Sequence, residues 1–261
     1  MHHTLMVAEY DVFRKMYEPI TGCTAILTPE NAEMKIPEAI GIAKRVKKPV
    51  YLVVAPDLVI KPVVRHNEQT AELAKTNEHS LRAVIGHVRK LLEQAQNVVI
   101  LVDMKTLRYE LQAYVQKLAE QMNVPAASMM QGKSAFDETY PHYIGMYSGA
   151  FGSEEVRGIV EGSDCVITVG LVWSDSNTGI LTARLNPLKT VDIQPSAVKV
   201  GEATYTNIMA EDMLNALQTI GYRQTKPVPN VSFPYDIISG EPEQPITAVS
   251  YYPHIQRDAE R

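Results

Sequence analysis

The chain has 261 residues, of which 45% are hydrophobic and 21% charged, and its formal net charge is -5. This balance is typical of a globular protein rather than a disordered one, and the acidic charge disfavours binding to nucleic-acid phosphates. Cys23 and Cys165 are the only cysteines, which disfavours a disulfide framework and a thiolate zinc site. No apolar run approaches the roughly 20 residues of a membrane helix. We therefore expect a cytoplasmic protein.

The first α/β pattern occupies residues 1–60. Cys23–Thr28 is rich in strand-forming residues, and Met34–Lys47 carries apolar residues at helical spacing. Val50–Val54 is a continuous apolar run, which predicts a strand that is buried on both faces. The apolar periodicity then disappears over residues 61–76, which we interpret as a linker.

A longer alternation of strands and helices occupies residues 77–222. The helical periodicity predicts helices over Glu78–Gln94, Leu107–Met122, Glu154–Glu161 and Glu211–Gly221. The short apolar runs predict strands over Val98–Val102, Pro125–Met129 and Cys165–Val169, and a last strand near Thr190–Ile193. This order predicts an α/β fold with a doubly wound, mostly parallel sheet of the Rossmann-like type.

The proline-rich stretch 223–245 predicts a second linker, and residues 246–261 begin another helix. The chain is therefore expected to hold one whole domain between parts of two others.

Several motifs for other functions are incomplete. Ala127–Ser134 fits the loosest form of the phosphate-loop pattern, but it contains two methionines, and Pro141 interrupts the helix that the mechanism needs. No glycine-rich dinucleotide turn follows Val98–Val102, and the histidines show no metal-ligand spacing. A small-ligand or nucleotide-binding protein on the same sheet is retained as a second hypothesis.

Five blocks carry a resemblance to a known family. They are MHHTL at Met1–Leu5, KPVYL at Lys48–Leu52, GKSAFDE at Gly132–Glu138, SDSNTG at Ser174–Gly179 and YPHIQ at Tyr252–Gln256. In this order they resemble the thiamine-diphosphate-dependent 2-oxo acid decarboxylases, which include pyruvate, indolepyruvate and branched-chain 2-oxo acid decarboxylases. The resemblance spans essentially the whole chain.

The resemblance implies a domain layout. Residues 1–60 would be the C-terminal part of the pyrimidine-binding domain, 77–222 the central domain, and 246–261 the start of the diphosphate-binding domain. The family's activating glutamate and its Gly-Asp-Gly diphosphate motif would lie elsewhere, and no Gly-Asp-Gly occurs in these 261 residues. The expectation is an internal fragment of a non-oxidative lyase that converts a 2-oxo acid to an aldehyde plus CO2, and that is inactive alone.

The same resemblance implies the catalytic residues and the cofactors. His2 and His3 would line the active site near the reacting carbon, where imidazoles suit proton transfer near neutral pH. From spacing alone, adjacent histidines at a chain start indicate a solvated end or the remnant of a tag. Thiamine diphosphate and Mg²⁺ are implied for the complete enzyme, and neither is expected to bind this chain alone.

Two departures from the family pattern concern the loop after the histidines and regulation. Met6 stands where the family has a glycine, so the loop is expected to follow another path. Lys105 occupies the position of the fungal enzymes' regulatory cysteine, while Arg108 is retained. Activation of the enzyme through that cysteine is therefore not expected.

The implied partners are a 2-oxo acid substrate and further copies of the same chain in a homo-oligomer, a dimer or a tetramer in the family. Neither nucleic acid nor membrane is expected as a partner. A third hypothesis is a non-catalytic subunit that docks on a complete decarboxylase.

Overall fold

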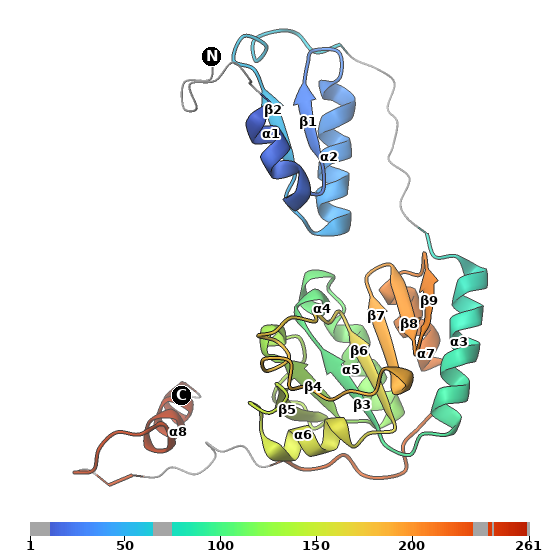
Figure 1. Ribbon diagram of the computed structural model, residues 1–261, viewed down its shortest axis with the longest axis vertical. Helices are drawn as coiled ribbons and strands as arrows, with labels where there is room; N and C mark the ends of the chain where they lie inside the picture. The colour runs from blue at the N-terminus through green and yellow to red at the C-terminus, as the bar shows by residue number, and fades with distance from the viewer. Residues whose placement is uncertain (1–10, 65–74, 232–239, 242, 260–261) are drawn as a thin grey trace. The chain divides into compact units, whose positions relative to one another are not determined.

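The computed structural model describes residues 11–64, 75–231, 240–241 and 243–259, and the chain divides into two compact units, Met1–Ala74 and Lys75–Arg261 (Figure 1). The larger unit has a mostly parallel seven-stranded sheet with helices, so the predicted α/β fold class is confirmed.

The described part of the smaller unit has three helical segments and two strands. Its elements are α1 (Val12–Tyr17), the 3-10 helix η1 (Glu18–Ile20), β1 (Thr24–Leu27), α2 (Ala32–Val46) and β2 (Tyr51–Val54). The two strands pair in parallel, from Thr24 opposite Tyr51 to Leu27 opposite Val54. The helix α2 is the crossover connection that a parallel pair requires.

The prediction that residues 50–54 are buried on both faces is wrong. Among the described residues β2 is only partly buried, and the side chain of Val54 is 48% exposed. Ile26 in β1 is 50% exposed. A parallel strand becomes buried on both faces when further strands and helices surround it, and the described part of this unit supplies a sheet of two strands.

The larger unit contains the longer series of elements. Its helices are α3 (Glu78–Glu93), α4 (Met104–Arg108), α5 (Gln112–Met122), α6 (Glu154–Glu161), α7 (Ala210–Gln218) and α8 (Ala248–Ala259). Its strands are β3 (Val98–Val102), β4 (Ala126–Met129), β5 (Tyr143–Tyr147), β6 (Cys165–Val169), β7 (Thr190–Gln194), β8 (Ala197–Val200) and β9 (Ala203–Thr206). Short 3-10 helices lie at η2 (Met130–Gly132) and η3 (Pro187–Lys189).

The strand order is β5-β4-β3-β6-β7-β8-β9, in which β5 to β7 are parallel and β8 and β9 form an antiparallel hairpin extension. Of these strands β3 comes first in the sequence and lies inside the sheet. The strands β4 and β5 follow on one side of β3, and β6 lies on its other side. The point where the order reverses therefore lies between β3 and β6. Ligands of doubly wound sheets bind at this point, beside the carboxyl ends of the strands.

The sheet separates two hydrophobic cores. Side chains of α3, α5 and α7 fill one core, and α6 with residues of the 228–231 segment fills the other. Successive residues of β3 alternate between them, with Ile100 in the first core and Leu101 in the second. Because both faces are covered, every residue of β3 is buried. Burial of one such side chain contributes about 1.5–3 kcal/mol.

The helix predicted over Leu107–Met122 is wrong as a single element. The chain forms α4 and α5 instead, and Glu110 between them has a positive φ of 58° that a continuous helix does not contain. Thr106 donates a hydrogen bond through Oγ1 to the carbonyl of Val169, and Leu111 N donates to Thr106 O. A contact with a distant strand therefore ends the first helix.

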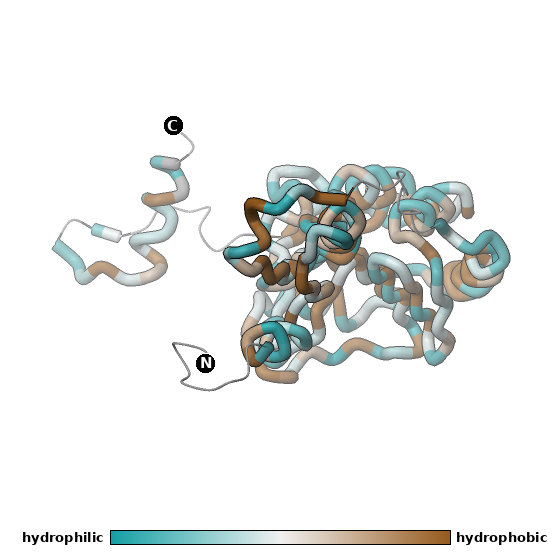
Figure 2. The backbone as a smooth tube through the Cα atoms, turned by 90° about the horizontal axis from the view of Figure 1, so that it is seen from above, coloured by the Kyte–Doolittle hydropathy of each residue, from teal (hydrophilic) through white to brown (hydrophobic). Residues whose placement is uncertain are grey.

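Besides the divided helix, the structure has three strands that were not predicted and one helix that ends three residues earlier than predicted. The strands β5, β8 and β9 were not predicted, and α7 ends at Gln218 rather than near Gly221. Buried and less buried residues alternate in β8, and partly buried and exposed residues alternate in β9, but each strand has only four residues, the shortest run that predicts a strand. The helix expected after residue 245 is present as α8, and its tube alternates hydrophobic and hydrophilic stretches in Figure 2.

The first residues of the stretch 223–245 pack against the seven-stranded sheet, within the same unit. The Gln224 side chain accepts a hydrogen bond from the backbone N–H of Val98 at 2.9 Å, and Val231 is buried in the second core. None of the helices in the described part of the chain is long and apolar enough to cross a bilayer.

Candidate functional site

His2 and His3, the sequence-predicted catalytic residues, lie outside the described residues. Their role therefore stays a prediction. Elsewhere, His87 lies with Nδ1 3.1 Å from the Tyr205 hydroxyl, and His142 stacks on Tyr140 at a centroid distance of 5.4 Å. Within the described ranges no group of three or more His, Cys, Asp or Glu side chains is arranged to hold a metal ion.

At the reversal point of the sheet, Asp103 follows β3 and is fully buried. Its Oδ2 accepts hydrogen bonds from Val172 N and from Asn177 Nδ2, both at 2.7 Å. The Asn177 side chain also accepts from Gln131 N at 3.1 Å. The asparagine of the SDSNTG block thus connects the loops that follow β3, β4 and β6.

The same loops approach one another closely. A Cβ on Gly132 would lie 2.6 Å from the Cα of Asp103, and a Cβ on Gly170 would lie 2.7 Å from the backbone nitrogen of Thr106. Gly170 also has a positive φ of 66°, which glycine adopts at little cost. The protein itself fills the position where a doubly wound sheet would hold a nucleotide.

These described residues do not fit thiamine diphosphate. A diphosphate with its divalent cation needs oxygen ligands around an open space. The one buried carboxylate at the reversal point, Asp103, is held by Val172 and Asn177, and backbone contacts close the surrounding space. No step of a reaction is therefore assigned to this edge of the sheet.

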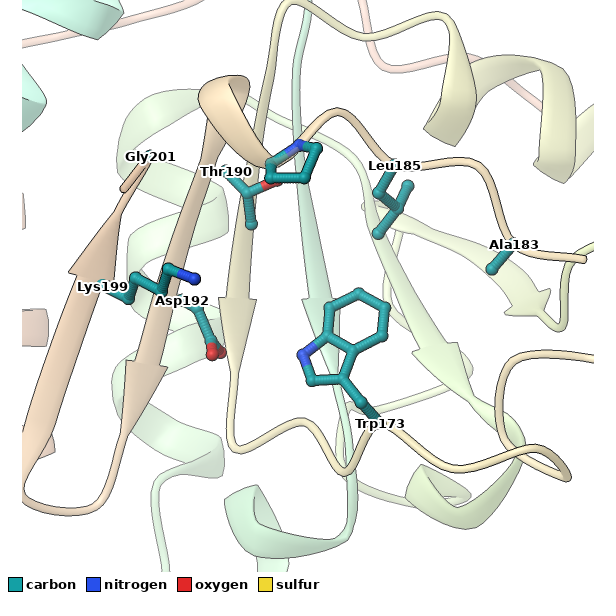
Figure 3. Close-up of a pocket in the computed structure, with 8 residues that line it drawn as sticks. Trp173, Ala183, Leu185, Thr190, Asp192, Lys199 and Gly201 are labelled. Atoms are coloured by element: carbon teal, nitrogen blue, oxygen red, sulfur yellow. The ribbon is translucent and has the colours of Figure 1, made fainter. Parts of the chain in front are cut away.

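A separate cavity of about 350 Å³ opens beside β7 and β8 in the larger unit (Figure 3). It is lined by Trp173, Ala183, Leu185, Pro187, Thr190, Asp192, Lys199 and Gly201. The indole of Trp173 faces the side chains of Asp192 and Lys199 across this cavity. Local sequence patterns did not predict this site, because Lys199 and Gly201 reach it only when β8 folds back on β7.

The carboxylate of Asp192 is held in place from one side. Its Oδ1 accepts hydrogen bonds from Thr168 Oγ1 at 2.6 Å and from Gln194 Nε2 at 3.0 Å. Gln194 accepts in turn from Lys105 Nζ at 2.8 Å. Lys199 is the cross-strand partner of Asp192 in the β7–β8 pair, so the two charged side chains lie on the same face of the sheet.

Two other titratable groups of this unit are structural. Burial raises the pKa of the Cys165 thiol to about 12. Burial, together with the hydrogen bond that the Tyr147 hydroxyl donates to Glu161, raises the pKa of Tyr147. Neither group is therefore suited to ionise near neutral pH.

Known proteins are similar to this chain over most of its length. A family model described as "Thiamine pyrophosphate enzyme, central domain" matches residues 85–220. The pyruvate decarboxylase of Aspergillus fumigatus is 32% identical over 98% of this chain and 46% of its own length. Pyruvate decarboxylase isozyme 1 of Saccharomyces cerevisiae is 30% identical over 84% and 40%, respectively.

The alpha-keto-acid decarboxylase of Mycobacterium leprae is 27% identical over 90% of this chain and 41% of its own length. The chain thus spans less than half the length of these curated relatives. The matched residues 85–220 begin within α3 and include all strands of the seven-stranded sheet and α7. The chain therefore belongs to the thiamine pyrophosphate enzyme family, and residues 85–220 are its central domain.

Proposed function

We propose that the protein containing this chain is a thiamine-diphosphate-dependent, non-oxidative 2-oxo acid decarboxylase, which forms an aldehyde and CO2. The main support for this proposal is that similarity to the A. fumigatus pyruvate decarboxylase covers 98% of this chain and not its central domain alone. Proteins that share only a central domain with this family would not match on both sides of residues 85–220.

In this proposal the central domain spaces the other domains and takes part in assembly, without a cofactor of its own. The closed reversal point around Asp103, Gly132 and Gly170 supports this role. Thiamine diphosphate and Mg²⁺ would be bound by other parts of the complete enzyme. The cofactor then supplies the electron sink for decarboxylation, whereas His2 and His3 carry protons near the reacting carbon.

We further propose that the protein assembles as a homo-oligomer, either a dimer or a tetramer. Its proposed compartment is the cytoplasm. Cys23 and Cys165 are free thiols, which suits a reducing environment. The domain layout is also part of the proposal, with residues 1–60 completing a pyrimidine-binding domain and residues 246–261 opening a diphosphate-binding domain.

Residues 1–261 alone are expected to bind no thiamine diphosphate. A ligand that binds the folded state raises the melting temperature as its concentration increases. We therefore expect the melting temperature of residues 1–261 to be unchanged by thiamine diphosphate with MgCl2. A dose-dependent rise that needs Mg²⁺ would contradict this expectation, and a rise with ATP or NAD instead would favour the small-ligand hypothesis.

The catalytic role of the histidine pair is tested in a chimera in which residues 1–261 replace the matching segment of a pyruvate decarboxylase relative. We expect His2→Ala or His3→Ala to lower turnover of a 2-oxo acid by about 100- to 10,000-fold, the usual cost of losing an acid–base group. His79→Ala is the matched control, because His79 lies on the exposed surface of α3. Equal turnover in all three variants and the parent chimera would remove the histidines from the mechanism.

A further inference from the structure

The cavity beside β7 and β8 holds polar groups that no described residue satisfies. The indole N–H of Trp173 and the ammonium of Lys199 make no hydrogen bond or ion pair within the described ranges, although both line the cavity. Asp192 uses Oδ1 for Thr168 and Gln194, and its Oδ2 accepts no hydrogen bond from the described residues. Two donors and one acceptor are therefore available to a ligand.

The lining of this cavity carries one negative and one positive side chain that do not form an ion pair. Asp192 and Lys199 are cross-strand partners, yet they are not among the ion pairs of the described residues, which join nitrogen and oxygen within 4.0 Å. The lining also contains the apolar side chains of Ala183, Leu185 and Pro187. The site thus combines one anion, one cation and an apolar wall.

We propose that this cavity binds a free α-amino acid with an apolar side chain. The ligand carboxylate pairs with Lys199 and accepts from the Trp173 N–H, and its ammonium pairs with Asp192 Oδ2. The ligand side chain packs against the Trp173 ring and Leu185. The hydrogen bonds from Thr168 and Gln194 hold the Asp192 carboxylate in position before the ligand arrives, which lowers the entropy cost of binding.

The lining residues favour an amino acid over ligands that carry only a carboxylate or only an amine. A simple carboxylate would leave Asp192 facing the ligand without a donor, and a simple amine would leave Lys199 without an acceptor, and both losses weaken binding. The volume of about 350 Å³ lies at the lower end of the roughly 300–1,000 Å³ of ligand pockets. That size suits an amino acid better than a nucleotide.

The chain contains one tryptophan, so its indole fluorescence reports on this cavity alone. Residues 1–261 are titrated with L-phenylalanine while Trp173 is excited at the red edge of its absorption, where tyrosine does not absorb. The matched probes are 3-phenylpropanoate, which lacks the ammonium, and 2-phenylethylamine, which lacks the carboxylate. None of the probes is a 2-oxo acid, so the result does not depend on the proposed decarboxylase function.

We expect L-phenylalanine to change the Trp173 emission saturably and both analogues to bind roughly ten- to a hundredfold more weakly, the effect of losing a charged hydrogen bond. Asp192→Asn and Lys199→Met are expected to weaken L-phenylalanine to a similar extent. Asp192→Asn retains the oxygen that Thr168 and Gln194 contact. Lys117→Met, on the exposed surface of α5, is expected to leave the affinity unchanged.

Three outcomes would overturn the proposal. The first is no saturable change with L-phenylalanine up to its solubility limit. The second is equal binding of 3-phenylpropanoate, which would mean that Asp192 does not select an ammonium group. The third is an equal loss of affinity in Lys117→Met and Lys199→Met, which would place the interaction elsewhere. The melting temperature of each variant is measured to confirm that it is folded.

Discussion

His142 shows how burial of one residue makes stability depend on pH. Neither ring nitrogen of His142 has a hydrogen-bond partner in the described structure, and burial lowers its pKa, while Glu120 acts in the opposite direction and Arg223 in the same. A folded-state pKa below the unfolded value of about 6.5 means that the unfolded chain takes up the proton first. Stability is therefore full above that value and is lost as pH falls through the lower folded-state pKa.

We expect His142→Phe to reduce this acid sensitivity. Phenylalanine can keep the stacking on Tyr140 and has no proton to bind. The melting temperature of the variant should fall less than that of the parent between about pH 7.5 and pH 5, the range around the unfolded histidine pKa. Parallel pH dependence of the two proteins would contradict a lowered pKa of His142.

At the scale of elements, the close packing of η2 against the end of β3 predicts opposite effects of two glycine substitutions. In Gly132→Ala the new Cβ would lie 2.6 Å from the Cα of Asp103, and backbone must move to accommodate it. Such overpacking typically costs about 1–3 kcal/mol. Gly158 lies in the helix α6 with no atom within 4 Å of its Cβ position. There, alanine is expected to stabilise by about 0.5–1 kcal/mol.

Urea unfolding of the two variants and the parent measures the change in the free energy of unfolding that each substitution causes. The expected midpoint order is Gly158→Ala above the parent and Gly132→Ala below it. If Gly132→Ala had the same free energy of unfolding as the parent, η2 would not be closely packed against the end of β3.

At the scale of the whole molecule, the apolar surface of the smaller unit predicts association. Among the described residues each strand of the β1–β2 sheet has one hydrogen-bonded neighbour, and Ile26 and Val54 are about half exposed. Ile36 and Ile40 of α2 are exposed as well. Unpaired strand edges and apolar surface invite pairing with other chains.

Light scattering over a range of concentrations tests this expectation. We expect the mean mass of residues 1–261 to rise with concentration, and Ile26→Lys with Val54→Lys to reduce the rise, because charges on a sheet oppose edge pairing. Replacing the exposed Lys117 by alanine is the control for a change elsewhere on the surface. A monodisperse monomer at all concentrations would show that this surface does not drive association.

The sequence by itself determined the elements with strong local patterns and the family. β3, β6 and α6 have the predicted bounds, because a short run of apolar and β-branched residues or an apolar stripe at helical spacing needs no distant partner to be recognised. The ordered blocks GKSAFDE and SDSNTG indicated a thiamine-diphosphate-dependent enzyme, and the match of the family model to residues 85–220 confirms that family.

Tertiary structure alone decided the features that depend on residues far apart in the chain. The break between α4 and α5 follows from the Thr106–Val169 hydrogen bond, which spans 63 residues. The filled space at the reversal point of the sheet follows from the Asp103–Asn177 hydrogen bond, which spans 74 residues. Likewise, Trp173, Asp192 and Lys199 form a cavity only because β8 folds back on β7. Local sequence preferences carry no information about such contacts, since their partners are chosen when the sheet assembles.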